Sequence, residues 1–539
     1  MHISNHRTTK MKKLCAILLL IAMTTALAVP AFAADITIES STSISTYAAE
    51  RSYNGYKLLN LTTSEENGNT RYAYTINEKY RSVLQNQVFS TADNAFWSSN
   101  KPANATDVTD AQILSYLSTL TSDSNGNPGT LRGFADILYR EIQSNSIFAD
   151  ETNNSGTFNN VEQGYWLIAD VTDLEDSEEA NSLVIVDTKG QESITVAPKT
   201  DVPTVEKKVQ EKNDSTGITS GWQDGADYDI GDDVPFQLTG TLPSNLASYE
   251  TYKYVFHDTL STGLTLNPNS ITVKIGEQIL TLNTDYTVKT TDLSDNCSFE
   301  IVINDILDIN NVTVDKNSSV VVEYTAKLNT GAVIGSAGNP NEVFLEFSNN
   351  PYGDGTGETP EDKVIVFTFQ LDVNKIDNDK QPVQGAGFTL YKYNSTTQNY
   401  EAVGEEIKGT ELTTFIWKGL DSGKYKLVET TVPDGYNKAD DILFTIEATY
   451  DTNAADPTLS NLVIKDADGK VISGENLIFT ATTSSGTVAT DVVNTTGIEL
   501  PETGGMGTTL FYIVGSALVI GAGVLLITKR RMGASHHNH

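Results

Sequence analysis

Three polar residues in the last third of the sequence fall on strand-like segments whose alternation points them into an apolar interior. Lys375 shares a face with Leu371 and Val373, while Glu429 and Asn494 take equivalent positions in a middle and a last segment. Burial disfavours charge, so it favours a neutral lysine amine and a protonated glutamic acid. A neutral amine is a nucleophile, and the set therefore predicts an intramolecular Lys375–Asn494 amide that forms with loss of ammonia, promoted by Glu429.

A related set lies in the middle of the chain. Alternation places Lys207, Asp258 and Asn349 on apolar faces, which predicts a Lys207–Asn349 bond with Asp258 in the acid role. A slip of one residue exchanges the two faces of a strand, so Lys208 and Asn350 remain alternatives.

Each set has a plainer interpretation, as a buried ion pair or as a partly exposed strand with an extended lysine. Two sets in tandem, each joining an opening strand to a closing strand in a region without disulfides, favour the covalent interpretation.

The elements that would position these residues are mostly strands. Val, Ile, Thr, Tyr and Phe alternate with polar residues between Gly, Asn and Asp turns, which predicts a mostly β chain of tandem β-sandwich domains. Apolar residues at helical spacing between Asp110 and Ser144 predict one or two helices inserted in the first domain. Proline-bearing joints divide the chain into a first domain at 34–200, a middle domain at 201–363 and a third domain at 364–497.

The N-terminal segment has the features of a secretory signal peptide. Basic residues precede an apolar run from Leu14 to Val29 and a small-residue site at Ala31–Ala33, which predicts that residues 1–33 are removed. Cys15 lies in this segment, so Cys297 is the one cysteine of the mature chain and no internal disulfide can form.

The formal net charge of -34 disfavours binding to nucleic acid or to anionic lipid.

The C-terminal segment, 498–539, combines three features. The pentapeptide Leu500, Pro501, Glu502, Thr503 and Gly504 precedes an apolar run over 508–528 and a basic cluster. The run is long enough for a transmembrane helix, and the basic cluster favours a cytoplasmic tail. The arrangement resembles the cell-wall sorting signal of Gram-positive surface proteins, which implies cleavage by a sortase between Thr503 and Gly504 and attachment to peptidoglycan.

Both reactive sets lie in segments that resemble a known family. VNKID around Lys375, the following PVQGAGFTLYK, YKLVETTVPDGY around Glu429 and VVNTTGIELPETG around Asn494 are similar to the collagen-adhesin B-type (Cna B) domains of Gram-positive pilins. The middle domain resembles the second domain of backbone pilins, in which a Lys–Asp–Asn set occurs. The resemblance implies immunoglobulin-like (Cna-type) β-sandwiches with internal isopeptide bonds.

The segment from Ile194 to Lys199 resembles the pilin motif of backbone pilins, although Gly190 and Ala197 stand where that motif has Trp and Tyr. The resemblance implies that Lys199 of one subunit attacks Thr503 of another while that threonine is bound to a pilin sortase.

The chain is thus identified as the backbone subunit of a covalent cell-surface pilus. Its implied partners are pilin-specific and housekeeping sortases, identical subunits, accessory pilins, peptidoglycan and a possible host surface ligand. The alternative is a monomeric wall-anchored adhesin with stalk-like domains.

The sequence does not favour an enzyme. It has no HExxH motif, phosphate loop or Ser/His pairing. We expect no cofactor, no metal and no catalysis beyond the self-cross-linking reaction. His257, next to Asp258, is expected to tune the pocket of that aspartate.

Overall fold

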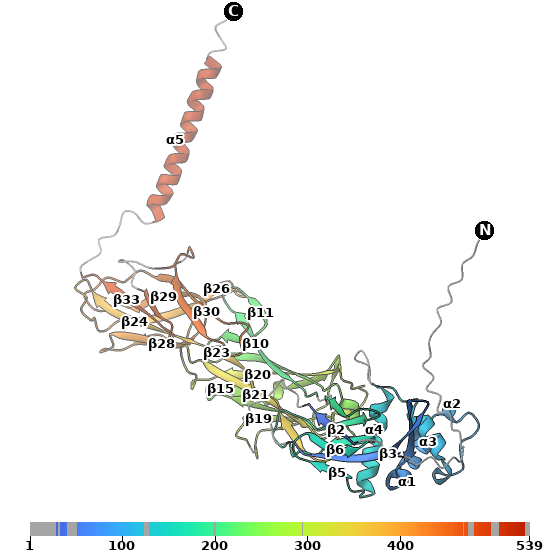
Figure 1. Ribbon diagram of the computed structural model, residues 1–539. Helices are drawn as coiled ribbons and strands as arrows, with labels where there is room; N and C mark the ends of the chain where they lie inside the picture. Colours follow the sequence, from blue (N-terminus) through green and yellow to red (C-terminus); the bar gives the residue numbers. More distant parts are fainter. Residues whose placement is uncertain are drawn as a thin grey trace, which may run out of the picture. The chain divides into compact units, whose positions relative to one another are not determined.

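The computed structural model describes residues 29–30, 33–39, 51–122, 129–197, 201–293, 295–466, 468–472, 479–496 and 506–533 (Figure 1). Strands dominate, as predicted. The chain divides into two compact units. The first comprises Met1–Val209, Asp233–Lys327 and Pro340–Val364, and the second comprises Gln210–Asp232, Leu328–Asn339 and Ile365–His539. The first domain and most of the middle domain therefore share one unit, and two short middle-domain segments belong with the third domain.

The first domain contains two sheets. One has the order β1-β3-β7-β8, with β4 and β5 also paired to β3, and the other has the order β6-β2-β9. The strands are β1 (Val29–Pro30), β2 (Ala33–Ile38), β3 (Tyr53–Glu66), β4 (Asn69–Ile76), β5 (Glu151–Asn153), β6 (Thr157–Glu162), β7 (Gly164–Asp170), β8 (Leu183–Asp187) and β9 (Ser193–Val196). β9 runs parallel to β2, which places the segment before Lys199 in the smaller sheet.

Helices cover part of this domain. They are α1 (Arg81–Thr91), α2 (Asn94–Trp97), α3 (Asp110–Leu117) and α4 (Thr130–Ser144), with the 3-10 turns η1 (Glu78–Tyr80) and η2 (Ala105–Asp107). The helices predicted between Asp110 and Ser144 are confirmed. Thr109 and Gln112 form a capping box at the start of α3. Helix α4 buries Phe134, Leu138 and Ile142, which are spaced by four residues and so lie on one face.

Two sheets also make up the middle domain. Within the first unit, one has the order β10-β13-β20-β16-β17 with β15 on β20, and the other has the order β21-β14-β19-β18 with β22 on β21. The elements are β10 (Val205–Asn213), β13 (Asp233–Thr241), η3 (Leu246–Ser248), β14 (Tyr254–Leu260), β15 (Leu264–Leu266), η4 (Pro268–Ser270), β16 (Thr272–Ile275), β17 (Gln278–Ile279), β18 (Thr287–Lys289), β19 (Phe299–Ile303), η5 (Ile306–Asp308), β20 (Ser319–Leu328), β21 (Asn339–Ser348), β22 (Thr356–Glu358) and β23 (Asp362–Phe367).

The third domain is built in the same way, from sheets with the orders β28-β24-β33-β32 and β26-β25-β29-β30-β31, with β27 on β25. The strands are β24 (Phe369–Asp377), β25 (Gly387–Asn394), β26 (Asn399–Ala402), β27 (Ile407–Lys408), β28 (Thr414–Leu420), β29 (Gly423–Thr431), β30 (Ile442–Tyr450), β31 (Leu459–Lys465), β32 (Phe479–Thr482) and β33 (Thr487–Asn494). The same unit holds β11 (Ile218–Gln223) and β12 (Gly225–Asp227). The opening strand β24 and the closing strand β33 are neighbours and run parallel. Apolar side chains of both sheets form one core.

Helix α5 (Met506–Gly533) includes the stretch 508–528 that was predicted to span a membrane. The structure does not confirm that span. Across the described part of the chain, no helix has both the length and the apolar character needed to cross a membrane.

The helical insertion offers a matched test of core packing. Leu138 is fully buried in α4, whereas the adjacent Ile137 is 42% exposed. We expect Leu138→Ala to lower the stability of the first unit by about 2–5 kcal/mol because it leaves a cavity, and Ile137→Ala to change it by about 0.5 kcal/mol or less. Calorimetry of the two variants measures the difference, and equal losses would contradict this packing.

Candidate functional site

Lys375 lies inside the third domain. Alternation along β24 buries it together with Leu371 and Val373, and its side chain is 0% exposed. Its Nζ donates hydrogen bonds to the carbonyl oxygens of Val492, at 2.9 Å, and of Ile376, at 3.4 Å. The lysine of the opening strand therefore reaches the closing strand β33.

Glu429 and Asn494 meet in the same interior. Asn494 ends β33, and its Nδ2 donates to Oε1 of Glu429 at 2.8 Å. The other carboxylate oxygen accepts a hydrogen bond from the backbone N–H of Ala439 at 2.7 Å. Oδ1 of Asn494 is buried and has no hydrogen-bond partner among the described residues. Buried carbonyl oxygens are rarely left unpaired, so this one marks an unusual site.

The electrostatics of Lys375 favour its neutral form. Burial lowers its pKa from 10.5 to about 8, although the negative charge of Glu429 acts in the opposite direction. A substantial fraction of the amine is consequently unprotonated at mildly alkaline pH. The residues predicted for this site, Lys375, Glu429 and Asn494, are thus brought into one buried pocket.

The second buried lysine is Lys207, on β10 of the middle domain. It is 0% exposed, and its Nζ donates to Oδ2 of Asp258 at 2.6 Å and to the carbonyl oxygen of Glu342 at 3.2 Å. Asp258 is also 0% exposed and accepts a second hydrogen bond from the hydroxyl of Tyr324 at 2.7 Å. The neighbouring Lys208 instead pairs with Glu206 near the surface, so the alternative register is wrong for the lysine.

The side-chain amide of Asn341 is linked to this pair through the hydroxyl of Tyr324. Its Nδ2 donates to the Tyr324 hydroxyl at 2.8 Å, its side chain is 0% exposed, and its Oδ1 has no partner among the described residues. The arrangement Lys207, Asp258, Tyr324 and Asn341 repeats the features of the third-domain site: a buried lysine, a buried acid and an amide with an unpaired carbonyl oxygen.

The prediction of Asn349 as the partner of Lys207 is wrong in this geometry. Asn349 is buried as predicted, but its Nδ2 donates to the carbonyl oxygen of Leu174 at 2.6 Å. In the antiparallel pair β14–β21, Asp258 lies opposite Val343. The partner amide must therefore come from the start of β21, where Asn341 lies. Asn349 is eight residues further on, about 27 Å along an extended strand, and so is too far from Lys207. The alternative Asn350 uses its Oδ1 to accept the N–H of Tyr352.

Burial acts on both members of the Lys207–Asp258 pair. It lowers the pKa of Lys207 and raises the pKa of Asp258, while their mutual attraction opposes both shifts. Both pKa shifts favour a neutral Lys207 amine beside a protonated Asp258, which is the state required for nucleophilic attack and proton transfer.

His257 does not tune this pocket, contrary to expectation. Adjacent residues of a strand point to opposite faces, so His257 leaves the interior that Asp258 enters. Its ring stacks on Phe344 with centroids 4.5 Å apart, and its nitrogens lie 2.7 Å from Asp295 and 3.3 Å from Glu346.

The remaining predicted site residues are Lys199 and the pentapeptide Leu500, Pro501, Glu502, Thr503 and Gly504. All of them lie outside the described residues. Their roles stay predictions. The strand before Lys199 is described, and its Ile194 and Val196 pack against a core formed by residues of both first-domain sheets.

Comparisons with known proteins agree on one class. Residues 230–351 match the Gram-positive pilin backbone subunit 2, Cna-B-like domain; residues 369–458 match a prealbumin-like fold domain; residues 492–532 match the LPXTG cell wall anchor motif. The trypsin-resistant surface T6 protein of Streptococcus pyogenes serotype M6 is 28% identical over 397 residues, 64% of this chain and 71% of that protein.

Among solved structures, the T6 backbone pilin of serotype M6 Streptococcus pyogenes is similar in fold. The TM-score is 0.50 at 19% sequence identity, and the match covers 88% of this chain and all of that chain.

The buried amine predicts a specific dependence of stability on pH. In Asn494→Ala, Lys375 stays a free amine. Its pKa is about 8 in the folded chain and 10.5 ordinarily, so the folded chain binds fewer protons between these values. We therefore expect the unfolding free energy of this variant to rise from pH 8 to pH 10.5, by at most about 1.4 kcal/mol per pH unit.

The control for that prediction is Lys375→Met in the same Asn494→Ala background. Tyrosines and other groups titrate alike in both proteins, so the difference between the two pH profiles isolates Lys375. Parallel profiles from calorimetry at several pH values would show that the amine is not desolvated.

Proposed function

We propose that this chain is a structural subunit of a sortase-polymerised, cell-wall-anchored pilus, like the Gram-positive backbone pilins that it resembles. We further propose that each subunit carries two internal isopeptide bonds, Lys375–Asn494 and Lys207–Asn341. The observation that carries this proposal is the recurrence, in two domains, of an unpaired amide oxygen buried in the same pocket as a lysine and an acid.

The same reaction fits both pockets. The neutral Nζ attacks Cγ of the asparagine, a C–N bond forms, and the bond from Cγ to Nδ2 breaks. The acid transfers a proton to the leaving amino group and recovers one from Nζ, so that ammonia departs and no other reactant is consumed. Contact between the reactants and exclusion of water supply the rate that an amide exchange lacks in solution.

The acid is placed differently in the two pockets. Glu429 accepts a hydrogen bond from the amino group that would leave Asn494, so it is positioned to protonate that group. Asp258 contacts the nucleophile Lys207 directly, and Tyr324 connects it to Asn341. We infer that Asp258 passes its proton through the tyrosine hydroxyl to the leaving group and recovers a proton from the amine.

The cross-links suit a protein that carries tension. Strands β24 and β33 open and close the third domain and lie side by side. A covalent bond between them would carry a pulling force past the hydrogen bonds of the sheets. It would also restrict the unfolded chain as a disulfide does, which typically adds about 2–4 kcal/mol.

Polymerisation would use a different lysine. We propose that a pilin sortase cleaves between Thr503 and Gly504 and that Lys199 of another subunit resolves the intermediate into an intermolecular amide. Accessory pilins with a sorting signal would join by the same chemistry, and a housekeeping sortase would transfer the finished fibre to peptidoglycan.

Intact mass measures the internal bonds directly. Each bond releases one ammonia, so the purified chain should be lighter than its sequence mass by about 17 Da per bond, or about 34 Da in total. Glu429→Gln should retain only the Lys207 bond and Asp258→Asn only the Lys375 bond, each with a deficit of about 17 Da.

Two asparagine variants test the assignment in the middle domain. Asn341→Ala should halve the mass deficit, and Asn349→Ala should leave it unchanged, because only Asn341 belongs to the pocket of Lys207. The opposite result would restore Asn349 as the partner, and a wild-type chain at full sequence mass would remove both bonds.

Polymerisation is tested on boiled cell-wall extracts. Wild type should give a ladder of high-molecular-weight bands on a denaturing gel, and Lys199→Arg should abolish it because arginine is not a nucleophile. Lys189→Arg, a nearby exposed change, is the matched control and should leave the ladder intact. A single band in wild type would favour a monomeric wall-anchored adhesin.

A further inference from the structure

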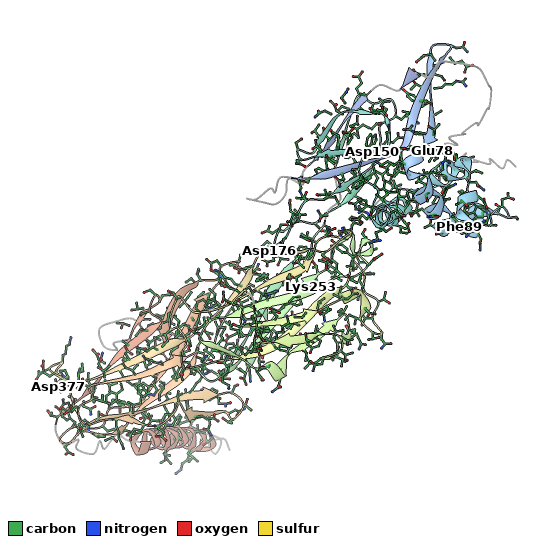
Figure 2. All side chains as sticks on the ribbon, turned by 90° about the horizontal axis from the view of Figure 1, so that it is seen from below. Glu78, Phe89, Asp150, Asp176, Lys253 and Asp377 are labelled. Atoms are coloured by element: carbon green, nitrogen blue, oxygen red, sulfur yellow. The ribbon has the colours of Figure 1, made fainter. Side chains whose placement is uncertain are left out.

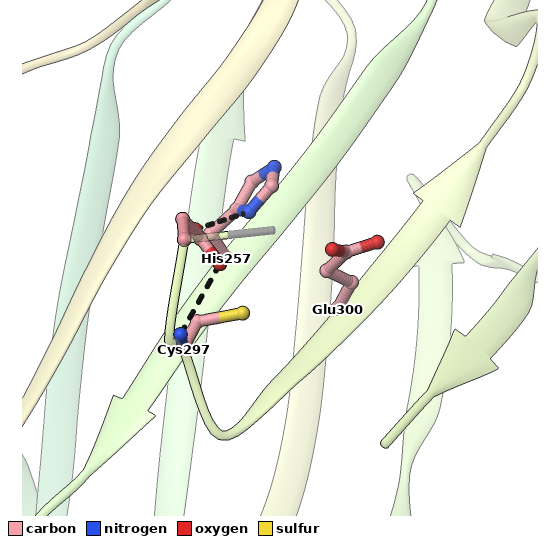
Figure 3. Close-up of side chains that lie close together, drawn as sticks. His257, Cys297 and Glu300 are labelled. Atoms are coloured by element: carbon pink, nitrogen blue, oxygen red, sulfur yellow. Dashed lines mark hydrogen bonds and ion pairs between the residues drawn. The ribbon is translucent and has the colours of Figure 1, made fainter. Parts of the chain in front are cut away.

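Four side chains with metal-binding atoms meet on the outer face of the middle domain. They are His257, Asp295, Cys297 and Glu300, and their ligand atoms all lie within 4.8 Å of one another. Figure 3 labels His257, Cys297 and Glu300. We propose that these residues form a zinc-binding site. This site is separate from the pockets of the buried lysines, and the inference does not depend on the isopeptide bonds.

The sheet itself brings the ligands together. His257 on β14 and Glu300 on β19 are directly opposite in the antiparallel pair. Asp295 and Cys297 lie in the segment that leads into β19. Oδ2 of Asp295 lies 2.7 Å from Nδ1 of His257, and its Oδ1 accepts the backbone N–H of Cys297 at 3.1 Å. The carboxylate is therefore held between the imidazole and the cysteine before any metal arrives.

The set of donor atoms indicates zinc. Calcium and magnesium prefer oxygen ligands alone, whereas zinc accepts imidazole nitrogen, thiolate sulfur and carboxylate oxygen together. Tetrahedral bonds of about 2.0–2.3 Å place zinc ligands roughly 3.3–3.8 Å apart. The most widely separated ligand atoms would therefore approach by about 1–1.5 Å, whereas Nδ1 of His257 and Oδ2 of Asp295, now 2.7 Å apart, would separate by about 0.6–1.1 Å. His257, Cys297 and Glu300 are each less than a tenth exposed, which excludes most water from the site.

The charges around the site also suit a divalent cation. Two carboxylates and one thiolate bring three negative charges. Lys289 pairs with Oε2 of Glu300 at 2.9 Å, and Zn²⁺ together with this lysine would neutralise all three. The thiol gives up its proton when it binds zinc.

The second nitrogen of His257 has the partner that a metal-bound histidine usually has. Nε2 lies 3.3 Å from Oε2 of Glu346, and Lys253 holds the other oxygen of that carboxylate at 2.6 Å. A carboxylate on the far nitrogen fixes the tautomer and orients the ring toward the metal.

A cavity of about 220 Å³ reaches the site, and His257, Asp295, Glu300 and Glu346 are among its lining residues. Asp176 and Lys253, both labelled in Figure 2, line it as well. The cavity gives a cation an entry path.

A second carboxylate cluster, in the other unit, provides the contrast. Asp214, Asp229 and Asp421 surround the ammonium of Lys392 at 3.0, 2.5 and 2.7 Å. That position already holds a cation, so it does not call for a metal.

The test uses the purified, reduced full-length chain after treatment with a chelator, with Co²⁺ as a spectroscopic probe for the zinc site. We expect one equivalent of Co²⁺ to produce the sulfur-to-metal charge-transfer band of a Co–thiolate bond, and Zn²⁺ to displace it. Cys297→Ser should lose the band and His257→Asn should weaken binding by tenfold or more, whereas Asp214→Asn should bind normally.

A thiol measurement keeps the test decisive if a variant fails to fold. In the wild-type chain, one equivalent of Zn²⁺ should slow alkylation of Cys297 at least tenfold, because metal-bound sulfur is a poor nucleophile. Absence of both the charge-transfer band and this protection would overturn the proposal. Binding that survives unchanged in Cys297→Ser would overturn it too, since the metal would then occupy another site.

Discussion

The burial of a lysine amine in an apolar interior is the constraint on which the rest of this structure depends. An isolated ammonium in such a place costs several kcal/mol, so the chain must offer it a partner, make it neutral or consume it. Lys375 and Lys207 are both fully buried, and each shares its pocket with an acid and with an amide whose oxygen is unpaired. A buried polar group without a hydrogen-bond partner costs free energy. A bond between the lysine and the asparagine would replace the amine, which can carry a charge, and the primary amide with one uncharged secondary amide.

The middle and third domains meet this constraint with different arrangements of the strands that carry the lysine, the acid and the asparagine. In the third domain the lysine and the asparagine lie on adjacent parallel strands, and the acid comes from the facing sheet. In the middle domain, the lysine lies in one sheet, and the acid and the asparagine lie on neighbouring antiparallel strands of the other. The longer path from Asp258 to Asn341 is filled by Tyr324 from the lysine's own sheet. The chemistry is therefore set by which side chains meet inside, and several strand orders can satisfy it.

The alternation of apolar and polar residues predicted well which side chains point into the interior, but it predicted poorly which positions along neighbouring strands lie side by side. It placed Lys375, Glu429, Asn494, Lys207 and Asp258 inward, and all five are buried. It selected Asn349, although Asn341, eight residues earlier, has the same parity and is also buried, and parity alone does not separate the two. The choice depends on the register between β14 and β21, which is set by contacts far apart in the sequence.

Other features left weaker sequence signals. Helix α1 was not predicted because its buried apolar residues, Val83, Leu84 and Val88, are too few to give a clear helical period. Nothing in the sequence distinguishes Tyr324 from the other core residues of β20. The cluster around Cys297 depends on an irregular segment that brings Asp295 to β14, and no pattern of alternation describes such a segment.

Strand β14 shows how one element can serve two kinds of cross-link. Its inward residue Asp258 would promote the proposed isopeptide bond, which would be permanent once formed because ammonia is lost and water is excluded. Its outward neighbour His257 belongs to a cluster whose proposed link is reversible, since a metal leaves when its concentration falls or its ligands are protonated. The two links act on different contacts: the covalent one joins the two sheets, and the metal would join β14 to β19 within one sheet. With both proposed links, a strand in an exported domain with a single cysteine would gain support on both faces without a disulfide, because alternation keeps the two chemistries apart.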